Sequence, residues 1–113
     1  MLKKQYRLKK KYQFNYTYKV GQTVGAKHLL VCYTKSKNKC VKIGLSVTKK
    51  IGKAVIRNRV KRILRVAIAN FLELLKKDFN IILIARPNIV ETDFKTVVKE
   101  VEFCVKKAGL VNE

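Results

Sequence analysis

The spacing of apolar side chains predicts strands in the first half of the chain and a long helix after them. Residues 27–34 are typical of a strand, and residues 40–48 alternate apolar and polar positions, as a half-buried strand does. We expect these two strands to pair antiparallel around a hairpin loop at residues 36–39. From about Gly52 to Lys77 the apolar residues, Ile56 among them, recur every three or four positions, which predicts an amphipathic helix.

The remaining pattern completes an α+β domain. Residues 79–85 are continuously apolar, which predicts a strand buried on both faces. Residues 92–108 return to helical spacing, with Thr92 as the cap, Phe94 facing inward and Gly109 as the stop. Strand–helix–strand order implies that residues 40–48 and 79–85 lie parallel in one sheet, with a crossover that general rules make right-handed. We expect one domain over residues 1–113, with a basic, partly mobile arm at residues 1–11.

Residues 12–20 fit two structures. Their apolar positions alternate strictly, which favours a strand. A helix would instead place Phe14 and Tyr18 on one face and Tyr12 and Tyr16 on another. The four aromatic rings, interleaved with lysines and amides, suit either core filling or stacking on single-stranded nucleic acid. Local pattern leaves both choices open.

Charge is distributed very unevenly along the chain. The formal net charge is +20, and residues 1–72 hold 20 Lys and Arg with no Asp or Glu. Self-repulsion of this size destabilises a compact chain, so a polyanionic partner is expected. Nucleic acid is the favoured partner. An anionic membrane is the rival, but the apolar stripe of the long helix is needed against the sheet, and no apolar run approaches the roughly 20 residues of a membrane span.

Arginine is concentrated in the long helix, although lysine is the common cation elsewhere. Four of the six arginines fall within nine residues, at Arg57, Arg59, Arg62 and Arg65. The guanidinium group donates a planar pair of hydrogen bonds that suits phosphate and base edges. Several cations also lie near the helix N-terminus, where the dipole disfavours them. Broken local rules of this kind indicate function, here an anion-binding surface.

Chemistry by the protein itself is not indicated. The cysteines, Cys32, Cys40 and Cys104, have no metal-ligand spacing. His28 is the single histidine, and we expect it to be a surface residue or a satisfied polar residue rather than a catalyst. Residues 1–72 contain no carboxylate to hold a metal or act as a general base. Three free thiols, with no signal-peptide pattern at the start, predict a reducing, cytoplasmic location.

Two segments carry a family resemblance. Leu45-Ser-Val-Thr-Lys-Lys-Ile-Gly, followed by Ala54-Val-Ile-Arg-Asn-Arg-Val-Lys-Arg, resembles the arginine-asparagine-arginine motif of bacterial ribonuclease P protein subunits. The likeness extends to Arg7-Leu-Lys-Lys and to Ile81-Ile-Leu-Ile-Ala-Arg. It implies the order α-β-β-β-α-β-α, a left-handed β-α-β crossover and a helix at residues 12–20.

The resemblance also implies partners and sites. The partners would be the ribonuclease P RNA subunit and precursor tRNA, with no membrane and no required protein partner. The RNA would do the chemistry and hold Mg²⁺, with none bound firmly by the protein. A cleft for the 5′ leader would include Phe14, Tyr18, Tyr33, Ser46, Thr48, Lys49 and Lys50. Catalytic RNA would be bound by Lys53, Arg57, Asn58, Arg59, Lys61, Arg62 and Arg65. The alternative is a ribosomal-protein-like RNA-binding module without a processing role.

Overall fold

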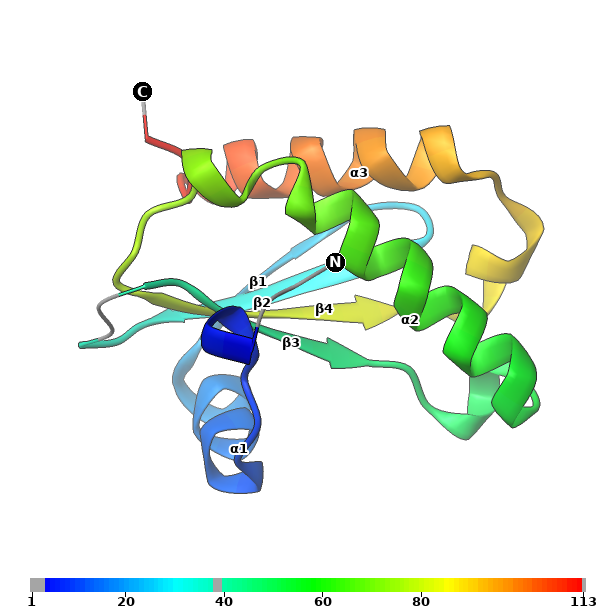
Figure 1. The fold of residues 1–113 in the computed structure, drawn as a ribbon, viewed down its shortest axis with the longest axis horizontal. Coiled ribbons are helices and arrows are strands. Elements are labelled where there is room, and N and C mark those ends of the chain that lie inside the picture. Colours follow the sequence, from blue (N-terminus) through cyan, green and yellow to red (C-terminus); the bar gives the residue numbers. More distant parts are fainter. Residues whose placement is uncertain (1–3, 38–39, 113) are drawn as a thin grey trace.

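A four-stranded mixed sheet forms the centre of the molecule (Figure 1). The structure is a computed structural model that describes residues 4–37 and 40–112. The sheet order is β1-β2-β4-β3, with β1 at Gln22–Gly25, β2 at Leu29–Lys35, β3 at Lys42–Ser46 and β4 at Phe79–Ala85. Strand β4, whose residues are almost all apolar, is central and has a neighbour on each side, as its predicted burial requires.

Three α-helices cover the two faces of the sheet. Helices α2 and α3 lie on one face and α1 on the other (Figure 1). Their bounds are Lys11–Val20 for α1, Ala54–Ala69 for α2 and Phe94–Lys107 for α3, with short 3-10 helices η1 at Lys4–Tyr6, η2 at Lys49–Ile51, η3 at Leu72–Leu74 and η4 at Pro87–Glu91. The predicted α+β class and the order α-β-β-β-α-β-α are confirmed. Residues 12–20, whose apolar positions alternate as in a strand, belong to helix α1.

The strand pairing differs from the predicted hairpin. Strand β2 pairs antiparallel with β4, and β3 pairs parallel with β4, so β2 and β3 are not neighbours. The hairpin prediction was wrong because β4 lies between them; the parallel prediction for β3 and β4 is confirmed. In Figure 1, β3 lies in front of β4 while α2 passes above both, so the β3-α2-β4 crossover is left-handed, as the resemblance implied and against the general preference.

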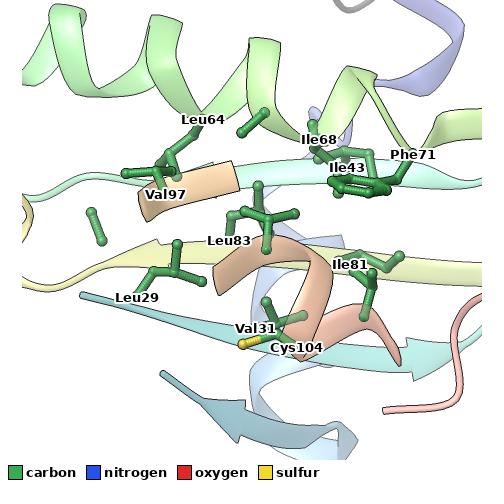
Figure 2. Close-up of a cluster of buried hydrophobic side chains, with 14 of the residues drawn as sticks. Leu29, Val31, Ile43, Leu64, Ile68, Phe71, Ile81, Leu83, Val97 and Cys104 are labelled. Atoms are coloured by element: carbon green, nitrogen blue, oxygen red, sulfur yellow. The ribbon is translucent and has the colours of Figure 1, made fainter. Parts of the chain in front are cut away.

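The main core lies between the sheet and helices α2 and α3 (Figure 2). Alternate residues of β4, Ile81 and Leu83, meet Leu64 and Ile68 of α2 and Val97 of α3 in one buried cluster. Full burial of each such side chain contributes about 1.5–3 kcal/mol. A smaller cluster lies on the opposite face under α1 and consists of Leu8, Cys32 and Ile82, with Phe14 and Ile84 packed against it.

Several element boundaries differ from the predicted ones. Helix α2 ends at Ala69 rather than near Lys77, because the chain must turn back toward β4; the backbone N–H of Lys76 donates to Leu110 O over 2.7 Å instead of continuing a helix. Helix α3 is capped by Asp93, not Thr92, since the Asp93 carboxylate accepts from the Thr96 backbone N–H. Two residues expected inside, Ile56 and Phe94, are exposed.

The N-terminal arm contacts the sheet through Arg7 and Leu8. The backbone N–H of Leu8 donates to Ile43 O over 2.8 Å, and Arg7 pairs with Ile43 as an isolated parallel bridge. Leu8 is 6% exposed within the smaller cluster. Strand β3 is an edge strand, so its outer backbone groups can pair with the arm. Beside it, Leu8 packs against Cys32 and Ile82. Part of the arm that was predicted to be partly mobile therefore contacts the sheet; residues 1–3 lie outside the described part of the chain.

His28 has hydrogen-bond partners, which was one of the two predicted alternatives. Its backbone N–H donates to Glu100 Oε1 over 2.7 Å, and its ring Nδ1 lies 2.5 Å from Glu100 Oε2. Both side chains are nearly buried. The pair fastens the β1–β2 turn to α3.

Within the described residues, no helix has both the length and the apolar character that a bilayer crossing demands.

Candidate nucleic-acid interface

The Phe14 ring packs directly on the backbone of β3 at Gly44. Helix α1 buries Thr17 against the sheet, and the Cys32 thiol donates to Thr17 O over 3.5 Å. This places the Phe14 ring over Gly44, where a Cβ atom would lie 2.6 Å from ring atoms Cε1 and Cζ. Since Gly44 has no positive φ, space rather than backbone conformation calls for glycine here.

A cavity of about 160 Å³ connects this ring with the arginine-rich helix at the outer edge of β3. Its lining comes from four elements and consists of Arg7, Leu8, Phe14, Ile43, Leu45, Lys61 and Arg65. Aromatic, aliphatic and cationic side chains therefore meet at one place. The two predicted sites are adjacent: Lys61 and Arg65, predicted to bind catalytic RNA, line the same cavity as Phe14, predicted to bind the leader.

The cations of α2 divide into groups. Asn58, Lys61, Arg62 and Arg65 line a second hollow, of about 290 Å³, on the helix surface. Arg59 instead lines a mostly apolar hollow beside η4, with Ile89 and Val90. The cations of α2 that were predicted to form one anion-binding surface therefore face more than one direction.

The other cations lie at or near the N-terminus of α2. Lys53 is its exposed N-cap residue, and Arg57 is half-buried with its Nε atom lacking a hydrogen-bond partner. Within the described residues, no carboxylate forms an ion pair with the arginines or Lys61 of α2. The described part of the chain therefore does not neutralise their charges.

Three of the seven predicted cleft residues, Phe14, Tyr18 and Ser46, lie on the α1 side of the sheet. The Tyr18 ring centroid lies 6.5 Å from that of Phe14, with the ring planes tilted by 46°. Ser46 lies two positions beyond Gly44 and so shares its face of β3. Thr48, Lys49 and Lys50 follow the end of β3 and are exposed, with Thr48 the N-cap residue of η2.

Tyr33 does not belong to this cleft. It pairs with Ile81 in the sheet and packs on the main core under α2 and α3, with its ring 6.3 Å from that of Phe79. Phe14 lies against the opposite face. The prediction that both rings share the cleft was wrong because successive strand residues point to opposite faces. The α1-facing position of β2 at this level is Cys32.

Four residues line the cavity but were absent from the predicted site: Arg7, Leu8, Ile43 and Leu45. The available signal was Leu8, an apolar residue between the basic residues Arg7 and Lys9, which indicates docking and so fixes the position of Arg7. Among residues 4–37 and 40–112, no three His, Cys, Asp or Glu side chains gather in a way that would hold a metal ion.

The fold and this surface define a class: small, strongly basic α+β proteins with an aromatic cleft beside an arginine-rich helix. The family model of ribonuclease P matches residues 2–109. The ribonuclease P protein component of Bacillus velezensis is 42% identical over 112 residues, covering 96% of this chain and 94% of that protein. That of Oceanobacillus iheyensis is 37% identical over 111 residues, covering 97% and 92%.

Solved structures agree with these sequence relatives. The RNase P protein of Staphylococcus aureus matches with a TM-score of 0.85 and 30% identity, covering 95% of this chain and 98% of that one. The RNase P protein of Thermotoga maritima matches with a TM-score of 0.78 and 28% identity, covering 86% and 92%. This chain therefore belongs to the ribonuclease P protein family, whose members are protein components of an endoribonuclease.

Proposed function

We propose that this chain is the protein subunit of ribonuclease P, which binds a catalytic RNA and the 5′ leader of precursor tRNA and so promotes removal of the leader. The observation that carries the proposal is the cavity in which Phe14 meets Lys61 and Arg65 at the edge of β3. It joins a stacking surface to a phosphate-binding surface. Family membership favours this function over a ribosomal-type RNA-binding module.

The leader would lie in the cleft on the α1 side of the sheet. Phe14 and Tyr18 offer two ring faces, and stacking of one base on one ring is worth about 1–3 kcal/mol. Ser46 supplies a hydroxyl on the same face, and the exposed Thr48, Lys49 and Lys50 follow at the end of the strand. Because mature tRNA lacks a leader, these contacts would favour the precursor.

The RNA subunit would be bound by the cationic face of α2. Arg62 and Arg65 share a hollow with Asn58 and Lys61, and no carboxylate of the described chain pairs with them. Lys53, Arg57 and Arg59 extend the positive surface toward the helix N-terminus. Bidentate arginine contacts would fix the geometry of assembly as well as its strength.

The hydrolysis itself would be performed by the RNA subunit. The first 72 residues, which build the cleft and α2, contain no carboxylate that could act as a general base or a metal ligand. Mg²⁺ would be held mainly by the RNA, while the protein lowers phosphate repulsion so that metal and substrate bind more readily. The complex would act in the cytoplasm without a further protein.

Reconstitution with the cognate RNA tests this function. The protein should stimulate cleavage of precursor tRNA at low magnesium concentration. Phe14→Ala with Tyr18→Ala should weaken precursor binding and leave mature tRNA binding unchanged. Phe103→Ala, at an exposed ring on α3, is the matched control and should change neither. RNA binding without stimulation would favour a ribosomal-type module, and equal losses for both tRNAs would refute leader binding.

Two substitutions at one residue test the arginine contacts separately. Arg62→Ala should weaken assembly with the RNA subunit by about 1–3 kcal/mol if the contact is bidentate. Arg62→Lys keeps the charge but loses the planar pair of donors, so most of this loss should remain. If Arg62→Lys assembles like the unmodified protein, charge alone accounts for binding.

A further inference from the structure

The outer face of α1 carries two exposed tyrosines that the proposed cleft does not use. Tyr12 and Tyr16 are 69% and 55% exposed. They lie four positions apart, so one stands above the other on the same side of the helix. The inner side holds Phe14 and the buried Thr17, which face the sheet. Helix α1 lies on the face of the sheet opposite α2 and α3 (Figure 1). Tyr12 and Tyr16 are exposed and lie on the side of α1 away from Phe14, so both rings face solvent.

The surroundings of these rings are cationic. Lys9, Lys10, Lys11 and Lys19 are all exposed at or beside α1, and residues 1–72 contain no carboxylate. Tyrosine is enriched in binding surfaces because it supplies a large, rigid, partly polar contact area. Rings flanked by cations alone suit a partner with both planar bases and phosphates. Single-stranded nucleic acid has both.

The outer rings are continuous with the cleft. Each residue of a helix advances by about 100° around the axis, so the side chains that follow Phe14 in angular order are Tyr18, Lys11, Asn15, Lys19 and then Tyr12. Tyr18 is 44% exposed and its ring contacts that of Phe14. A band of rings, an amide and two cations therefore runs from the cleft around α1 to its outer face.

We propose that Tyr12 and Tyr16 form a second stacking platform for the precursor leader, holding nucleotides farther from the cleavage point than those at Phe14. The proposal rests on the proposed function above and specifies how much of the leader the protein contacts. Phosphates between the two platforms would pass Lys19. The platform would be reached only by leaders long enough to leave the cleft.

Leader length provides the test. Holoenzyme affinity should be measured for precursors with leaders from one to about 16 nucleotides, the upper range of site sizes for comparable modules. Tyr12→Ala with Tyr16→Ala should leave short leaders unaffected and weaken long ones by about 25-fold, taking the lower end of stacking strength, about fivefold, for each ring. Tyr12→Phe with Tyr16→Phe keeps both rings and should bind like the unmodified protein.

The outcomes separate this platform from the cleft. A loss that is equal at all leader lengths, no loss at any length, or weaker binding of the RNA subunit alone would overturn the proposal. The Phe14→Ala, Tyr18→Ala protein should lose affinity already for short leaders, so failure of the proposed function has a different signature. Both tyrosines are exposed, so the alanine variant should keep its melting temperature, as Phe103→Ala should.

Discussion

Replacement of Gly44 by alanine should displace the Phe14 ring. The added Cβ would lie 2.6 Å from two ring atoms and 3.2 Å from Leu8 Cδ2, whereas carbon atoms pack best at about 3.5–4.0 Å. The strand cannot retreat because Gly44 pairs with the fully buried Ile82 of β4. The ring must therefore move outward by roughly 1 Å.

The net cost follows from two opposing effects. Overpacking of this kind destabilises by about 1–3 kcal/mol. Loss of glycine's freedom in the unfolded chain offsets about 0.4–1 kcal/mol. A net destabilisation of roughly 1–2 kcal/mol remains, equivalent to about 4–8 °C in melting temperature per kcal/mol for a small domain. Gly44→Ala should also weaken precursor binding, since Phe14 is no longer in place.

A double-mutant cycle measures the clash directly by thermal unfolding. Phe14→Leu removes the ring atoms that the new Cβ would meet, so Gly44→Ala should cost less in that background, with a coupling of about 1 kcal/mol or more. Gly25→Ala is the matched control, because its Cβ would meet only the ends of the Arg86 and Leu30 side chains, at 3.1 Å. Additive effects of the Gly44 and Phe14 changes would refute the packing account.

Four further predictions concern charge, stability and reactivity. RNA affinity should fall by about 10³–10⁵ between 50 and 200 mM salt if six to ten phosphates are contacted, which filter-binding titrations check. Glu100→Ala should destabilise by about 1–3 kcal/mol in denaturant titrations, because the His28 N–H loses its acceptor. Hydrogen bonds from Thr96 lower the pKa of Asp93. The stability that Asp93 contributes is therefore present above the unfolded pKa near 3.8 and is lost as the pH falls through the lower folded pKa. Asp93→Ala should make the melting temperature depend less on pH in that range. Burial, reinforced by Glu100, raises the pKa of Cys104 to about 11, so mass spectrometry should find this thiol alkylated at pH 8 only after denaturation.

Sequence patterns predicted well those elements whose partners are nearby in the chain. The continuous apolar run of β4, the helical stripe of α2 and the glycine stop of α3 at Gly109, with its φ of +73°, are all present. Each depends on local periodicity or backbone conformation. The clustering of Asn58, Lys61, Arg62 and Arg65 in one hollow likewise follows from helical spacing alone.

Features that depend on distant partners were not predictable from local pattern. The alternation in residues 12–20 favoured a strand, yet Thr17 and Phe14 are turned inward together by docking on Cys32 and Gly44. Strand order was hidden because β2 meets β4, about 50 residues later in the chain, instead of its neighbour β3. Tyr33 was misplaced for a related reason: only the register of the sheet shows to which face a given strand residue points.

The arm that pairs with β3 also bears on how copies of this protein avoid one another. An edge strand presents unpaired backbone groups that can add a strand from a second molecule, and here Arg7 and Leu8 occupy that side at Ile43. Free copies are kept apart by a net charge of +20, but bound RNA neutralises this repulsion while bringing copies together. Removal of residues 1–8 should therefore leave the free protein soluble at low salt and make it self-associate through β3 when polyanions or high salt screen its charge.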